Sequence, residues 1–390
     1  MRIGVVVWLI LACGVVAALH VGKAAIATPM LLADLGLGLG EAGWLTGIFA
    51  VLGLLGGAPA GVVAAAIGGR TTLLLGLGVM ALAGAAGAVA PSYPILLASR
   101  LLEGLGFVLI IVAGPAILER LTTGARRDMA FSLWSCFMPC GMAIAMLAGP
   151  LFQTWQAFWW SSVGLAAVSA VLVACCVPRG TSLGGRALGR MSGDIRCLLS
   201  SRGTPLLAIG FALYSLMFFA LFSFLPVLLM ERMDVSYRHA GLLSALASAI
   251  NASGNLAAGY LLARGAGRAS LVVIASCVMG VSGIGIFFGL VPAFPTFLLC
   301  LLFSAVGGVI PATLLASAPL VARDAALVPV AVGLIMQGSS LGQLLGAVTV
   351  GGVTAAFGWG AAGAVVALSA VAACATALLL SPAFSAPRAT

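Results

Sequence analysis

The sequence predicts an all-α membrane protein with twelve transmembrane helices arranged as two pseudo-symmetric six-helix bundles. Composition, recurring apolar segments and one central polar stretch predict this fold class. Hydrophobic residues make up 63% of the chain and charged residues 7%, against about half and about a quarter in an ordinary soluble domain. A water-soluble fold cannot bury so much apolar surface, so we expect the protein to be embedded in lipid.

Apolar segments of about 20 residues recur along the whole chain, and each is long enough to cross a hydrocarbon layer about 30 Å thick. The predicted spans are residues 4–32, 42–66, 72–90, 94–118, 129–152, 157–177, 205–229, 239–262, 269–290, 296–319, 329–352 and 358–381. The first span is too long for the apolar core of a signal peptide, and no small-residue cleavage pattern follows it. We therefore expect it to be a retained helix.

The longest polar stretch divides the twelve spans six and six. It predicts an N-terminal bundle over residues 1–177, a cytoplasmic linker over 178–204, a C-terminal bundle over 205–381 and a cytoplasmic tail over 382–390. A polar stretch between two equal sets of spans is typical of a link between two membrane domains.

Short internal repeats support this division. The turn after the second span of each half ends in arginine, as GVVAAAIGGR (61–70) and GYLLARGAGR (259–268). A shorter pair, RRDMA (126–130) and ARDAA (322–326), lies in equivalent loops. Two repeated six-helix halves are typical of a transporter whose binding site lies between them near the bilayer midplane.

The net charge of +9 could suggest a nucleic-acid partner, but the arginines gather in alternate connections. These connections hold Arg2, Arg70, Arg120, Arg126, Arg127, Arg179, Arg186, Arg190, Arg196, Arg202, Arg264, Arg268, Arg323 and Arg388. The opposite connections hold only Arg232 and Arg238, which lie beside Glu231 and Asp234. Positive loops face the cytoplasm, so both termini are predicted there, in a bacterial-type inner membrane, and no nucleic-acid partner is expected.

Four motifs resemble those of the major facilitator superfamily. The two Arg-ended turns are similar to its loop motif Gly-x-Leu-Ala-Asp-Arg, although Ala65 and Ala263 replace the acidic residue. RLLEGLGF (100–107) resembles its fourth-helix motif, with Glu103 in place of glutamine, and AMLAGPLF (145–152) partly matches its fifth-helix Gly-Pro motif. The resemblance implies a secondary transporter. In the family the acidic residue helps to latch the outward-facing state, so its absence here puts that latch in doubt.

A finer resemblance concerns two stretches of the N-terminal half. LHVGKAAIATPMLLADL (19–35) and FSLWSCFMPCGM (131–142) are similar to segments of importers of the cyanate and nitroimidazole type. Those importers carry an arginine in the first helix, and Lys23 takes its place here. The resemblance implies an anionic solute.

Four ionisable side chains in the predicted spans point to an anion site. Lys23 and Arg100 are expected at similar depths, with His20 and Glu103 each three residues away on the same helix face. A charge in a span costs at least about 2.5 to 3.5 kcal/mol on insertion scales, and an ammonium and a guanidinium together suit a carboxylate. Alternatively, Arg100 and Glu103 form a structural ion pair while Lys23 snorkels outward.

Uncharged polar residues complete the predicted binding site. Asn251 and Asn255 share a face of the eighth span, and Gln337 and Ser340 lie near the middle of the eleventh. Amides supply donors and acceptors to a polar ligand, although they also serve in interhelical hydrogen bonds. Trp134 is predicted to supply an aromatic wall, with Tyr214 of the seventh span; lipid-facing or core positions are the alternative for both.

These features predict a secondary active transporter that moves a small organic or inorganic anion by alternating access. We expect a proton as coupling ion, with Glu103, Asp34 or His20 as its carrier; a buried neutral histidine is the alternative for His20. Proton-driven efflux of drugs or metabolites is the alternative function, because the fifth-helix Gly-Pro motif is common in exporters. The sequence contains no ATPase, metal-ligand, disulfide or hydrolase pattern, so we expect a non-enzyme without cofactor or metal. We also expect a monomer.

Overall fold

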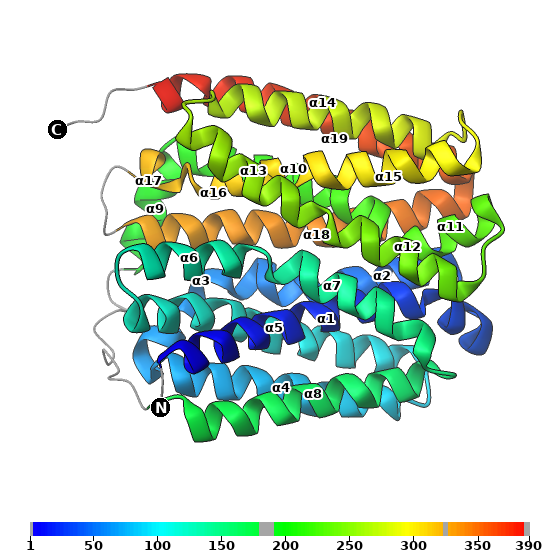
Figure 1. Ribbon diagram of the computed structural model, residues 1–390, viewed down its shortest axis with the longest axis horizontal. Helices are drawn as coiled ribbons and strands as arrows, with labels where there is room; N and C mark the ends of the chain where they lie inside the picture. Colours follow the sequence, from blue (N-terminus) through cyan, green and yellow to red (C-terminus); the bar gives the residue numbers. More distant parts are fainter. Residues whose placement is uncertain (1–2, 179–190, 323–326, 386–390) are drawn as a thin grey trace.

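The computed structural model describes residues 3–178, 191–322 and 327–385, and all regular secondary structure in these ranges is helical. Long helices lie side by side along a common direction (Figure 1). The N-terminal half contains α1 (Ile3–Leu35), α2 (Leu39–Gly47), η1 (Ile48–Ala50), α3 (Val51–Ile67), α4 (Gly69–Ala88), α5 (Tyr93–Leu121), α6 (Ala125–Ser135), α7 (Phe137–Ala148), η2 (Gly149–Leu151) and α8 (Trp155–Cys176).

The C-terminal half begins with a short helix that falls in the predicted linker. It contains α9 (Met191–Ser200), α10 (Gly203–Phe222), α11 (Leu225–Met233), α12 (Tyr237–Ala249), α13 (Asn251–Ala263), α14 (Arg268–Phe287), α15 (Ala293–Gly307), α16 (Val309–Leu315), α17 (Ala318–Val321), α18 (Val328–Phe357) and α19 (Trp359–Ser385). The rest of the predicted linker, residues 179–190, and most of the predicted tail lie outside the described residues.

Ten helical segments of the described chain are long and apolar enough to cross a membrane, and an eleventh is counted if one bent pair forms a single span. That pair, over 129–135 and 137–151, bends by 44° near Cys136, just before Pro139, which lacks an N–H donor for the helix. The predicted span 239–262 is divided at Ile250 between α12 and α13, which are 13 residues each. The total of twelve therefore stays a prediction.

The molecule has two ends that we name by their turns. The linker face carries the α3–α4 turn at Gly68, the α5–α6 turn over 122–124 and Pro178. The opposite face carries the turns over 36–38 and 234–236. In Figure 1, α1 begins and α19 ends at the linker face.

The two halves are in close contact toward the opposite face. There α2 packs on α18, α7 on α12 and α1 on α11. The hydroxyl of Tyr237 donates to the carbonyl oxygen of Ile26 (2.9 Å), and that of Ser248 to the carbonyl oxygen of Pro139 (3.0 Å). A Cβ atom added to Gly351 would lie 2.5 Å from the carbonyl oxygen of Leu39, so glycine permits this approach of backbones.

Candidate functional site

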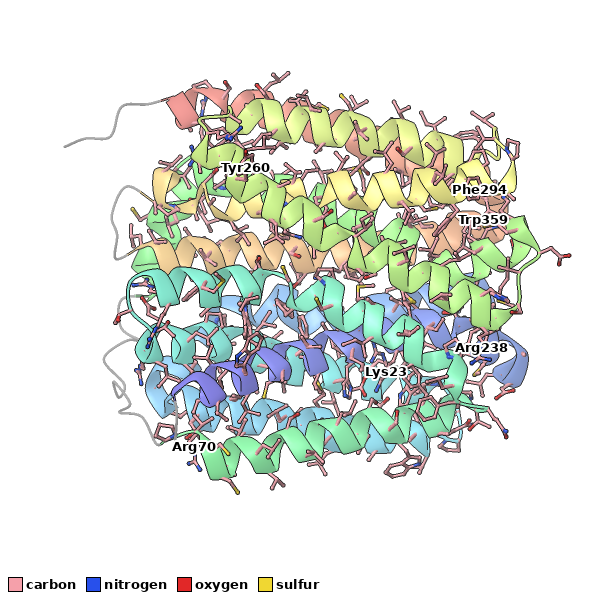
Figure 2. All side chains as sticks on the ribbon, viewed as in Figure 1. Lys23, Arg70, Arg238, Tyr260, Phe294 and Trp359 are labelled. Atoms are coloured by element: carbon pink, nitrogen blue, oxygen red, sulfur yellow. The ribbon has the colours of Figure 1, made fainter. Side chains whose placement is uncertain are left out.

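A cavity of about 1720 Å³ lies between the halves and is lined by helices of both. Arg70, Glu119, Arg120 and Arg127 line its outer part, so it reaches the linker face. Figure 2 shows Arg70 at that end of the molecule, Arg238 at the other end, and Lys23 between them. The volume exceeds the range of about 300 to 1,000 Å³ common for small-ligand sites.

The walls of the cavity differ in chemistry. The wall from the N-terminal half is largely apolar and aromatic in its inner part, with Val108, Ile111, Val112, Phe131, Trp134, Phe137 and Met138. The wall from the C-terminal half carries most of the polar side chains, namely Tyr214, Ser215, Asn251, Asn255, Ser339, Ser340 and Gln343. A solute in the cavity therefore meets an apolar surface on one side and hydrogen-bonding groups on the other.

The polar wall is held by hydrogen bonds between helices. The Asn251 amide nitrogen donates to the carbonyl oxygen of Ser304 (2.9 Å) and to the hydroxyl of Tyr214 (3.4 Å). The Asn255 amide nitrogen donates to Oδ1 of Asn251 (3.1 Å). These bonds orient the amides before a solute arrives.

Trp134 is seated in a slot made by two glycines. A Cβ on Gly14 of α1 would lie 2.9 Å from Cζ3 of the indole, and one on Gly114 of α5 would overlap the same ring. Phe137 lies beside it, with ring centroids 5.1 Å apart. The indole is therefore a fixed part of the apolar wall.

The mouth of the cavity is positively charged. Arg127 pairs with Glu119 (2.9 Å), and Arg70 donates to the carbonyl oxygen of Ala174 (2.7 Å). With Arg120, three guanidinium groups and one carboxylate line this end, and such an excess of one sign attracts solutes of the other.

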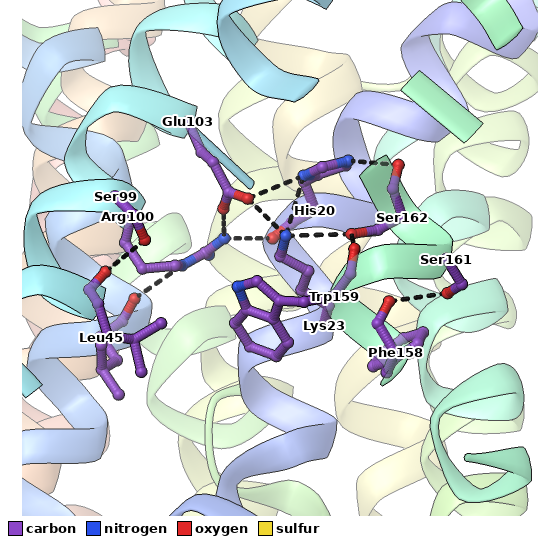
Figure 3. A network of polar contacts seen from close by, with 11 residues as sticks. His20, Lys23, Leu45, Ser99, Arg100, Glu103, Phe158, Trp159, Ser161 and Ser162 are labelled. Atoms are coloured by element: carbon purple, nitrogen blue, oxygen red, sulfur yellow. Dashed lines mark hydrogen bonds and ion pairs between the residues drawn. The ribbon is translucent and has the colours of Figure 1, made fainter. Parts of the chain in front are cut away.

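A second polar feature lies wholly inside the N-terminal half. His20, Lys23, Arg100 and Glu103 are fully buried and form one network, the N-half cluster. Lys23 Nζ donates to Oε1 of Glu103 (2.5 Å) and to Oγ of Ser162 (3.1 Å), and lies 4.6 Å from the ring centroid of Trp159. Figure 3 shows these side chains converging from α1, α5 and α8.

The contacts of His20 define its tautomer. Nε2 lies 3.2 Å from the carbonyl oxygen of Ser162, which can only accept, so Nε2 carries the hydrogen. Nδ1 of the neutral ring then accepts from Lys23 Nζ, 3.2 Å away. Nδ1 also lies 3.3 Å from Oε1 of Glu103, a contact that becomes a hydrogen bond only when His20 is protonated.

Arg100 and Glu103 complete the N-half cluster. Arg100 Nη1 donates to Oε2 of Glu103 and to the carbonyl oxygen of His20 (2.9 Å), while Nε donates to the carbonyl oxygen of Leu45 (3.2 Å). Gly84 of α4 makes room for the carboxylate, because a Cβ there would lie 2.9 Å from Oε1 of Glu103. One carboxylate is thus shared by two cationic side chains.

Aromatic rings lie between the N-half cluster and the cavity. The Arg100 guanidinium stacks on Phe49, 4.6 Å from its ring centroid, and Phe49 contacts Phe107 at 5.3 Å. Phe107 in turn lies 6.4 Å from Phe137, which lines the cavity. The N-half cluster is therefore near the cavity without lining it.

The predicted site residues separate into three groups. Trp134, Asn251, Asn255 and Ser340 line the cavity, whereas His20, Lys23, Arg100 and Glu103 form the N-half cluster. Gln337 instead donates from Nε2 to the carbonyl oxygen of Leu54 (3.0 Å), and Asp34 is exposed near the end of α1. The alternative in which Lys23 snorkels outward is wrong, because its ammonium is buried against Glu103.

Several site residues were not singled out from the sequence. Ser162 and Trp159 of α8 contact Lys23, and Ser215, Ser339 and Gln343 line the cavity. Ser215 and Ser339 are joined through their hydroxyl oxygens (3.0 Å). Serines are common in apolar spans, so only the periodic placement of Ser339 and Gln343 near Ser340 could have pointed to the polar wall.

Two membrane-embedded halves that meet at one face around a cavity open at the other define a membrane transport protein. The chain belongs to the Major Facilitator Superfamily, whose family model matches residues 10–328.

Solved structures have the same fold. The D-xylose-proton symporter superposes with a TM-score of 0.79 at 16% identity, covering 99% of both chains. A bacterial homologue of the human lysosomal transporter Spinster, inward-facing and occupied, gives a TM-score of 0.74 at 17% identity over 98% of this chain and 96% of that one. At these identities the likeness concerns the fold alone.

Two relatives of described function match parts of the chain. The 3-(3-hydroxy-phenyl)propionate transporter of Escherichia coli is 28% identical over 228 residues, covering 57% of this chain and 56% of that protein. The efflux pump terG of Aspergillus terreus is 31% identical over 111 residues, covering 27% of this chain and 21% of the pump. The chain thus spans about half, and about a fifth, of these relatives.

Proposed function

We propose that the protein is a twelve-span secondary active transporter that moves a small organic anion with an aromatic ring across the inner membrane by alternating access. The cavity between the halves carries this proposal, since it is open at the linker face while the halves meet at the opposite face. Rocking one half against the other would expose the same walls to the other side of the membrane.

The walls support the chemistry of this solute. The rings of Trp134, Phe137 and Tyr214 suit an aromatic group. The amides and hydroxyls of the polar wall suit oxygen substituents. The arginines of the mouth favour an anion, and the E. coli relative named above is a transporter of an aromatic propionate.

The net positive charge of the N-half cluster favours the binding of an anion. Lys23 and Arg100 carry two positive charges against the single carboxylate of Glu103. For an assumed separation of about 10 Å and an effective dielectric constant of about 20, Coulomb's law gives about 1.7 kcal/mol between one excess charge and an anion, more than tenfold in affinity. The N-half cluster thus acts on the solute through the aromatic layer, without contact in this conformation.

Of the predicted proton carriers, His20 has contacts that can change with protonation. Glu103 is already shared by Lys23 and Arg100, and Asp34 is exposed near the end of α1. A proton on Nδ1 of His20 would turn its contact with Glu103 into a hydrogen bond and displace Lys23 as donor. We therefore propose coupling to protons through His20.

Three solutes of matched shape test the proposal. Purified protein is tested by thermal shift and in proteoliposomes with 3-phenylpropionate, its neutral amide and the cation 3-phenylpropylammonium. We expect the carboxylate to raise the unfolding temperature most, because a ligand that binds only the folded state stabilises it, and to accumulate along an imposed pH gradient. Preference for the cation would overturn the anion assignment.

Efflux of apolar compounds is the second candidate, favoured by the apolar inner wall of the N-terminal half and by the likeness to terG. Inside-out vesicles separate the two functions. Proton-driven uptake of an uncharged or cationic dye into such vesicles, with no response to 3-phenylpropionate, would establish efflux.

A further inference from the structure

Two cysteines far apart in the sequence meet on the outer side of the C-terminal half. Sγ of Cys277 in α14 lies 3.5 Å from Sγ of Cys374 in α19. Neither residue lines the cavity between the halves. The pair is therefore separate from the proposed transport site and does not depend on it.

The packing of α14 on α19 places these thiols opposite each other. A Cβ on Gly280 would lie 2.7 Å from Cβ of Ala370, and one on Gly283 would lie 2.6 Å from Cγ1 of Val366. As the residue number increases along α14, the number of the contacting residue in α19 decreases, so the two helices are antiparallel and in tight contact. Cys277 and Cys374 are the next matched positions along this seam.

The hydrogen bonds of the pair assign its protons. The thiol of Cys374 donates to the carbonyl oxygen of Val273, 3.7 Å away. The remaining sulfur lone pairs of Cys374 can then accept from the thiol of Cys277. Both groups are thus neutral thiols in this arrangement, and a ligand must displace two protons.

The surface around the pair is apolar. Cys277 is exposed and Cys374 half-buried, and the nearby Ile274 and Val371 have 61% and 69% of their surface exposed. Cys277 is near the middle of α14, a 20-residue span. The pair therefore faces the lipid in the interior of the bilayer, where a lipid-soluble, uncharged reagent can reach it and an ion cannot.

We propose that Cys277 and Cys374 form a lipid-facing dithiol site that binds trivalent organoarsenicals. Arsenic(III) holds its ligands in a pyramid, so two sulfur ligands with bonds of about 2.3 Å, the length of zinc–thiolate bonds, are about 3.4 to 3.8 Å apart, which includes the observed spacing of 3.5 Å. With an arsenic(III) oxide, two As–S bonds form, the As–O bonds break, and the oxygen leaves as water with the two thiol protons. Nothing is oxidised or reduced.

Phenylarsine oxide is the probe for this site. The full chain is reconstituted in lipid nanodiscs with the other grouped or exposed cysteines replaced by serine, namely Cys136, Cys140, Cys175, Cys176 and Cys197. Intact-mass spectrometry should find one phenylarsenic adduct per chain. The adduct should survive excess 2-mercaptoethanol and be removed by 2,3-dimercaptopropanol, because only a chelating dithiol competes with two protein thiols.

Cys277→Ser and Cys374→Ser are the matched variants, and each should lose the resistant adduct completely while keeping its gel-filtration profile. In the unaltered protein, the arsenical should protect both cysteines from N-ethylmaleimide, as read by peptide mapping. A resistant adduct that persists in either single variant, or that maps to other cysteines, would overturn the proposal. So would the absence of a resistant adduct in the parent.

Discussion

The side-chain amide of Gln337 donates a 3.0 Å hydrogen bond to the carbonyl oxygen of Leu54, and this bond marks the level at which the two halves separate. Toward the opposite face, Gly47 of α2 lies against Val348 and Leu344 of α18. Toward the linker face, a Cβ on Gly61 or Gly333 would meet no atom within 4 Å. The seam between α2–α3 and α18 thus changes from tight contact to open cavity within a few turns.

Gly351→Val should weaken the closure of the opposite face. Its Cβ would crowd the carbonyl oxygen of Leu39 and Cζ of Phe224, 2.5 and 3.0 Å away. Overpacking costs about 1 to 3 kcal/mol, so the population open at that face should rise about 5-fold or more. The measurement is the labelling rate of Ser340→Cys, in the cavity wall, by an impermeant maleimide added at the opposite face.

Gly352→Val is the control for this experiment. The two glycines are neighbours in α18, but a Cβ on Gly352 has no atom within 4 Å. The labelling rate should stay unchanged in this variant. Equal labelling rates in the Gly351→Val and Gly352→Val variants would show that the contact of Gly351 with Leu39 does not hold the opposite face closed.

Lys23→Met should weaken anion binding selectively. The substitution removes the excess positive charge of the N-half cluster while Arg100 keeps Glu103 as partner. The affinity for 3-phenylpropionate should fall about tenfold, whereas that for its neutral amide should stay the same. Isothermal titration with both probes measures the difference, and an equal loss for both would contradict the electrostatic role.

Lys23→Arg is the control variant that keeps the positive charge. The unfolding temperature of each variant is measured to check that its fold is intact. The arginine variant should keep most of the carboxylate affinity, since the charge is retained while its geometry changes. The methionine variant should be at least as stable as the parent, because a costly buried charge is gone.

Glu103→Gln should be the most destabilising change in the N-half cluster. It leaves Lys23 and Arg100 buried without the carboxylate that both contact, and breaking a buried pair costs about 3 to 5 kcal/mol. The double variant Lys23→Met/Glu103→Gln should recover part of the loss. The free energy of unfolding in detergent is measured for the parent, the two single variants and the double variant. If the effects of the two substitutions were additive, the two side chains would not be coupled.

Cysteine labelling tests the predicted orientation. Ser92→Cys, at an exposed turn of the opposite face, should react with an impermeant maleimide in intact cells. Thr123→Cys, exposed in the α5–α6 turn of the linker face, should react only after the membrane is opened. Native Cys197, exposed in α9, is an internal reference for the cytoplasmic side. Labelling of Cys197 in intact cells would contradict the predicted topology.

The membrane fold could be predicted because composition and segment length report directly on the solvent. Of the internal breaks, the bend near Cys136 has a signal in the sequence, Pro139 inside the predicted span 129–152. The break at Ile250 has none, because it precedes Gly254, where a Cβ would overlap the carbonyl oxygen of Ala305 on α15. Such a contact between distant segments leaves no periodic signal in a sequence.

The site could be predicted in part. Helical spacing and depth correctly grouped His20, Lys23, Arg100 and Glu103, since i,i+3 neighbours share a face. Spacing along a helix does not say which neighbour that face meets. The N-half cluster is turned toward Ser162 of α8 and away from the cavity, and the amide of Gln337 is occupied by a backbone carbonyl.

Between the described parts of the two halves, closure depends on contacts without charge. The ion pairs of the described residues, of Glu103 with Lys23 and Arg100 and of Glu119 with Arg127, all lie within the N-terminal half. Across the seam there are glycine backbones and a few neutral hydrogen bonds. A gap of about 0.5 to 1 Å already removes about a quarter to a half of the dispersion attraction between packed atoms, whereas salt screens only charges. The opening of the opposite face should therefore be nearly indifferent to ionic strength and should respond to hydrostatic pressure and to the lateral compression of the bilayer.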